Sequence, residues 1–192
     1  MKIECARNVL FLLIVSALLS CASGKGHLDL GRATSKPGLD LQNSRLGILP
    51  LRSYPADIGS VISVVMGNEL KDTGIEITET AEMIRILREQ NITPRSIIQS
   101  SDYRMIGRVC QVDYLLVGKA VITILSKTFV RTGVFPADFQ ETTAEIVDTT
   151  SGEVVLRATV ERPPKEKWHS AEIIGEALAA AIKKELAKYK QP

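Results

Sequence analysis

The chain is poor in the residue types that build most catalytic and metal sites. Its 192 residues include three cysteines, two histidines and one tryptophan, and aromatic residues make up 5% of the total. Neither histidine stands at a spacing typical of metal ligands, and no cluster is available to complete a tetrahedral site. The sequence also lacks a nucleophile elbow, a phosphate-binding glycine-rich loop and a dinucleotide fingerprint. We therefore expect no enzymatic activity, no metal and no cofactor.

An excess of charge of either sign is also missing. Residues 1–20 hold Lys2, Arg7 and Glu4, so 22 of the 24 basic and 21 of the 22 acidic residues lie beyond them. A chain this close to neutrality has no basic stripe of the kind that binds a phosphate backbone. We therefore expect no nucleic-acid partner.

The first twenty residues have the pattern of an export signal. Lys2 and Arg7 precede an apolar run of eleven residues, 9–19. A helix of that length extends about 16 Å, which is about half of the ~30 Å hydrocarbon core of a membrane. Residues 1–20 are therefore predicted to be a signal peptide and not a membrane-spanning anchor.

The end of this run predicts a lipid anchor. The sequence Leu18-Leu19-Ser20-Cys21 resembles the lipobox of bacterial lipoproteins, in which the thiol is acylated before cleavage. This resemblance implies that Cys21 is the lipidation site and carries three acyl chains. A single chain binds a membrane only marginally, so stable anchoring needs two or more. The absence of Asp directly after Cys21 resembles lipoproteins sorted to the outer membrane. We expect a protein of the cell envelope, anchored in the outer membrane and facing the periplasm; a plain secreted protein is the alternative.

Beyond Cys21 the composition changes twice. Residues 21–43 are rich in Gly and polar residues and have no sustained apolar period, which is typical of a flexible tether. Residues 44–192 are long enough for one ordinary domain. With Cys5 in the signal and Cys21 lipidated, Cys110 has no partner for a disulfide, and we predict that it is a small buried hydrophobic residue.

Hydrophobic periodicity in this domain predicts the element order βαβααβββα. Strands are expected over residues 45–51, 75–79, 113–124, 142–148 and 153–161, and helices over 57–73, 80–91, 94–110 and 171–188. Thr80 and Ser170 are the expected N-caps of the second and last helices, and Ala81, Ile84 and Leu87 are the expected inner face of the second. Two β-α units followed by an antiparallel meander indicate a single-domain α/β sandwich, with a mixed sheet and helices packed on it.

One loop has an unusual aromatic content. Residues 127–139 include Phe129, Phe135 and Phe139 between two predicted strands. Exposed aromatic residues on loops often bind partners, and Trp is enriched at interfaces. We predict that these three residues and Trp168 form a partner-binding surface; a hydrophobic flap over the sheet edge, with Trp168 in ordinary packing, is the alternative.

Several segments together resemble the CsgG-like lipoprotein superfamily. They are Ile48-Leu49-Pro50-Leu51, Ile75-Glu76-Ile77-Thr78-Glu79, Tyr114-Leu115-Leu116-Val117-Gly118 and Glu145-Ile146-Val147-Asp148-Thr149-Thr150-Ser151-Gly152-Glu153-Val154. The likeness covers about residues 45–188, so residues 44–192 would be a CsgG-like domain. The superfamily includes CsgG, a component of curli assembly and transport, and more distantly LpoB, an activator of penicillin-binding proteins.

The resemblance implies a non-enzymatic accessory or scaffolding component of outer-membrane transport or assembly. Its partners would be other envelope proteins, with a homo-oligomer as a further possibility. Two alternatives stay open: an LpoB-like activator of a peptidoglycan synthase, and a ring-forming secretion channel subunit. Membrane strands need about 9–11 residues of apolar alternation, and Lys127 and Arg131 interrupt the best candidate, residues 121–134. A tether of about 22 residues has an r.m.s. reach of only ~25 Å, which counts against an activator of a distant synthase.

Overall fold

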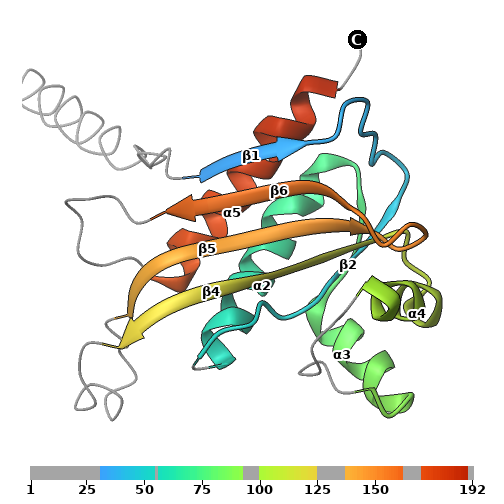
Figure 1. Ribbon diagram of the computed structural model, residues 1–192, viewed down its shortest axis with the longest axis horizontal. Helices are drawn as coiled ribbons and strands as arrows, with labels where there is room; N and C mark the ends of the chain where they lie inside the picture. The colour runs from blue at the N-terminus through green and yellow to red at the C-terminus, as the bar shows by residue number, and fades with distance from the viewer. Residues whose placement is uncertain (1–30, 55, 93–99, 125–136, 162–169, 190–192) are drawn as a thin grey trace, which may run out of the picture.

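The computed structural model describes residues 31–54, 56–92, 100–124, 137–161 and 170–189. These residues form one mixed six-stranded sheet with helices on both faces (Figure 1). The strands are β1 (Gly31–Ser35), β2 (Arg45–Ile48), β3 (Glu76–Thr78), β4 (Tyr114–Ile124), β5 (Ala137–Asp148) and β6 (Val154–Glu161). The helices are α2 (Ala56–Leu70), α3 (Thr80–Glu89), α4 (Ser100–Cys110) and α5 (Ala171–Leu186), with short 3-10 turns η2 (Lys71–Thr73) and η4 (Ala187–Tyr189). The predicted α/β sandwich is confirmed.

The sheet has the order β1-β6-β5-β4-β2-β3. The strand β2 lies parallel to both β3 and β4, as two successive β-α units require. The remaining neighbours, β4 with β5, β5 with β6 and β6 with β1, are antiparallel. The long strands of the predicted meander therefore lie at the centre of the sheet.

The folded domain begins inside the segment that the sequence assigned to the tether. The strand β1 pairs with β6 from Gly31 to Ser35, and Leu39 and Leu41 lie in the core. The prediction of a tether over residues 21–43 is therefore wrong for residues 31–43. The five-residue sequence of β1 has one apolar side chain, Ala33, and its first residue lies against α5. A Cβ atom at residue 31 would lie 2.7 Å from the Ala177 carbonyl oxygen, so glycine is required there.

The helices form two layers of different extent. In Figure 1, α2 and α5 lie behind the sheet, and α3 and α4 lie towards one end of it. The larger core joins α2 and α5 to one face of the sheet, with Leu46, Ile48, Ile62, Met66, Leu116, Ile146, Leu156, Leu178 and Ile182 at its centre. The smaller core joins α3 and α4 to the other face through Leu49, Met83, Leu87, Ile106, Cys110, Leu115, Val117 and Val147. Only part of that second face is covered by described helices.

A buried carboxylate ties α5 to the end of β1. The Glu185 residue is 6% exposed, and its side chain accepts hydrogen bonds from Lys188 Nζ at 2.6 Å and Ser35 Oγ at 2.9 Å. The Tyr189 hydroxyl lies 3.1 Å from the same Ser35 oxygen. The hydrogen bond from Lys188 and that from Ser35 hold the pKa of Glu185 below its ordinary value.

We expect the Glu185→Gln variant to lose more stability near neutral pH than in acid. A carboxyl whose pKa is lower in the folded state contributes stability above its unfolded pKa, and that contribution is lost as pH falls through the folded value. Thermal unfolding of parent and variant at about pH 7 and at successively lower pH measures this, because the difference should shrink as the parent carboxyl becomes protonated. A loss of melting temperature that does not change as pH falls would show that the charge of Glu185 does not stabilise the contact.

Candidate functional site

Four of the five predicted functional residues lie outside the described residues. These are the lipidation site Cys21 and the aromatic residues Phe129, Phe135 and Trp168. Their roles stay predictions.

The fifth predicted residue, Phe139, is not part of an exposed loop. It lies within β5, pairs with Ile122 of β4 and is 5% exposed in the larger core. The strand begins at residue 137 rather than 142, and a register shift between Val121 and Ile122 sets the Phe139 side chain on the helix-covered face. The prediction that Phe139 binds a partner is therefore wrong. The hydrophobic effect favours this burial, since a fully buried Phe side chain contributes about 1.5–3 kcal/mol.

The isolated cysteine Cys110 is buried, as predicted. It is 5% exposed and packs in the smaller core beside α3. Burial raises the pKa of its thiol to about 11. The thiolate, which is the nucleophilic form, is therefore scarce at neutral pH.

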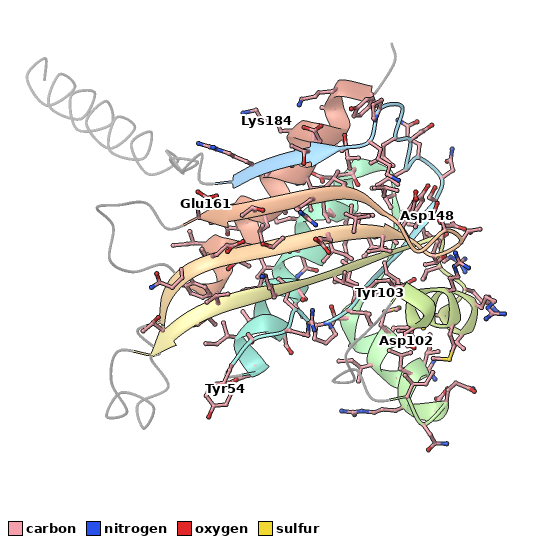
Figure 2. All side chains as sticks on the ribbon, viewed as in Figure 1. Tyr54, Asp102, Tyr103, Asp148, Glu161 and Lys184 are labelled. Carbon is pink, nitrogen blue, oxygen red and sulfur yellow. The ribbon has the colours of Figure 1, made fainter. Side chains whose placement is uncertain are left out.

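The part of the sheet beyond α3 and α4 presents a polar surface, which we call the open face. Cross-strand pairs set its side chains in rows: Lys119 beside Thr143, Glu145 beside Arg157, and Thr159 beside Arg32. The other members of the open face are Thr34, Val121, Glu141 and Glu161; Glu161 is labelled in Figure 2 near the end of β6. No helix of the described residues packs on this surface, and Val121 is 45% exposed in it. Polar residues alternate here with buried apolar ones, as in a sheet that has one face solvated.

A groove of about 230 Å³ lies where the open face meets α4. Leu49 and Val117 form part of its apolar lining, and Tyr103 borders it from α4 (labelled in Figure 2). Arg52, Lys119 and Glu145 supply its charged groups. Burial and the nearby carboxylate of Glu145 raise the pKa of the Tyr103 phenol, so the hydroxyl stays protonated and can donate a hydrogen bond.

The chain after β2 positions the basic side of this groove. Leu49 N donates to Leu116 O at 3.0 Å, Arg52 N donates to Gly118 O at 2.9 Å, and Ala120 N donates to Arg52 O at 2.8 Å. These bonds hold residues 49–52 against β4 beyond the end of β2 itself. The groove was not predictable from the sequence, because its charged residues come from three separate segments.

Neither a membrane-spanning helix nor a metal-binding cluster is found in the described ranges. None of their helices is both long and apolar enough to cross a membrane. Within the same ranges, no group of three or more His, Cys, Asp or Glu side chains is arranged to hold a metal ion.

Comparisons with known proteins identify solved structures but no sequence family. No family model and no curated protein matches the chain. A variant PelC dodecamer from Paraburkholderia phytofirmans matches with 19% identity and a TM-score of 0.51, over 81% of this chain and 97% of that one. Lipoprotein GNA1162 from Neisseria meningitidis matches with 10% identity and a TM-score of 0.50, over 73% and 96%. The LpoB C-terminal domain from Escherichia coli, at 14% identity, covers 66% and 90% with a TM-score of 0.41.

At these identities the first two matches show a shared fold. They show it over nearly the whole length of the PelC and GNA1162 chains. These matches give no support to a specific likeness to the curli component CsgG.

Proposed function

We propose that this protein is a non-enzymatic lipoprotein of the bacterial envelope, anchored through Cys21 in the outer membrane and facing the periplasm. Its α/β domain would act as an accessory or scaffolding component of envelope transport or assembly, by binding other envelope proteins. The observation that carries this proposal is the sequence Leu18-Leu19-Ser20-Cys21, placed at the end of an apolar run and shortly before a folded domain.

The position of β1 restricts how far the domain can lie from its anchor. Ten Cα–Cα steps separate Cys21 from Gly31, the first residue of β1. Each step spans at most about 3.6 Å, so the start of the sheet lies within about 36 Å of the lipidated residue. The domain would therefore work close to the membrane surface. An activator of a peptidoglycan synthase would need a synthase that projects to within that distance.

The comparisons support the envelope assignment at the level of the fold. Of the PelC and GNA1162 structures, which share the fold, the second is named a lipoprotein and the first is described as a dodecamer. The dodecamer favours a second candidate function, in which this chain assembles into a ring of identical subunits at the membrane.

Light scattering coupled to size exclusion, on the detergent-extracted protein, separates these two functions. We expect a monomer or dimer for an accessory component, and its partner would then be sought by crosslinking. A single species of eight or more subunits would contradict the accessory role and favour the ring, which conductance measurements could then test for a pore.

A further inference from the structure

Two positively charged residues lie side by side at the groove, and neither forms an ion pair within the described residues. Arg52 and Lys119 are partners in an isolated parallel bridge, so their side chains leave adjacent strands on the same face of the sheet. Adjacent strands are about 4.8 Å apart, and like charges in directly opposed positions destabilise a sheet. The bonds from Arg52 N to Gly118 O and from Ala120 N to Arg52 O fix this arrangement through the backbone.

The carboxylate that lines the groove beside this pair forms an ion pair with another residue. Glu145 lines the groove, but its Oε1 atom accepts from Arg157 Nε at 2.8 Å and lies 2.7 Å from the second guanidinium nitrogen of that residue. Among the described residues, neither Arg52 nor Lys119 forms an ion pair. The two cations therefore have no ion-pair partner among the described residues, and an anion that enters the groove would reduce their repulsion.

We propose that the groove binds a phosphate group between Arg52, Lys119 and Tyr103. Arg52 lines the groove from the segment after β2, Lys119 from β4 and Tyr103 from α4. Donors supplied by three separate segments suit a tetrahedral phosphate, which has several strong acceptor oxygens, better than a planar carboxylate. The apolar lining from Leu49 and Val117 leaves room beside the phosphate for a short organic group. Nothing in this assignment depends on Cys21.

The test is calorimetric titration of the detergent-extracted mature protein with inorganic phosphate, at constant ionic strength in chloride. We expect saturable binding that Arg52→Gln and Lys119→Gln each weaken about tenfold or more, because each removes a charge-assisted hydrogen bond. The matched control is Arg88→Gln, which removes an exposed charge on α3 outside the groove and should leave the affinity unchanged. Absence of saturable binding, or equal weakening in the control, would overturn the proposal.

Thermal unfolding without phosphate separates binding from a structural role. Removing one of two opposed cations relieves repulsion, so both groove variants should melt at or above the temperature of the parent. A lower melting temperature with unchanged phosphate affinity would contradict the proposal.

Two further ligands identify the source of the phosphate. Tighter binding of glycerol phosphate than of inorganic phosphate would support a phosphate ester such as a lipid headgroup, and equal binding would support free phosphate. Acetate binding as tight as that of phosphate would overturn the assignment of a phosphate site.

Discussion

The Gly59→Ala variant is expected to melt about 6–12 °C below the parent, which corresponds to a loss of about 3 kcal/mol in a domain of this size. Gly59 lies in the first part of α2, where the helix crosses the chain that leaves β2. A Cβ atom there would lie 1.9 Å from the Leu51 carbonyl oxygen, which is backbone and cannot rotate away. The helix would have to move outward, and Ser63 would then lose the hydrogen bond that its Oγ accepts from Leu51 N at 2.9 Å.

A matched control lies two turns further along the same helix. At Gly67 a Cβ atom would meet only the terminal Cδ1 of Ile48, at 3.0 Å, and that side chain can adjust. Ala also favours the helix over Gly by about 1 kcal/mol, so we expect Gly67→Ala to be close to neutral or slightly stabilising. Thermal unfolding of the two variants measures the difference. Equal stability of both would show that α2 does not pack on residue 51 as described.

The Cys21→Ala variant is expected to leave the membrane fraction. Each buried acyl CH₂ contributes about 0.8 kcal/mol to membrane binding, so loss of the anchor should reduce the bound fraction by more than about tenfold. Fractionation at high salt, with immunoblotting, measures this. Cys110→Ala is the control, because its buried thiol carries no lipid and the variant should stay with the membrane.

An uncleaved signal peptide could itself retain the Cys21→Ala chain. The companion variant therefore exports residues 22–192 behind an ordinary cleavable signal peptide, and we expect it to be recovered in the soluble fraction. Membrane retention of this second variant at high salt would refute the lipid anchor as the main attachment.

Local chemistry made some elements predictable from the sequence. Ser170 caps α5 as expected, and its Oγ accepts from Ile173 N at 3.3 Å. The turn between β5 and β6 was readable because Asp148 accepts from the backbone of Thr150 and Ser151, and Gly152 takes a positive φ of 77°. These features depend on residues close together in the chain.

Features set by tertiary packing were not predictable in the same way. Thr80 is the first residue of α3 rather than its cap. Leu87 is buried as expected, but Thr80 and Met83 are buried with it in place of Ala81 and Ile84. A contact with the sheet determines how α3 is rotated about its axis, because Met83 packs against Gly47 of β2, which has no side chain.

The groove is another feature that depends on tertiary packing and could not be predicted from the sequence. Arg52 and Lys119 meet only because the chain after β2 continues beside β4, and their sequence separation gives no signal of this. The edge strand β1 was missed because its neighbours, and not its own composition, determine that it pairs.

The intact mass of the protein extracted from membranes tests whether the mature chain begins at a lipidated Cys21. We expect a chain that starts at residue 21 and carries the added mass of three acyl chains, with the modification confined to the N-terminal peptide after proteolysis. A mature protein that starts at another residue, or a residue 21 without lipid, would contradict it.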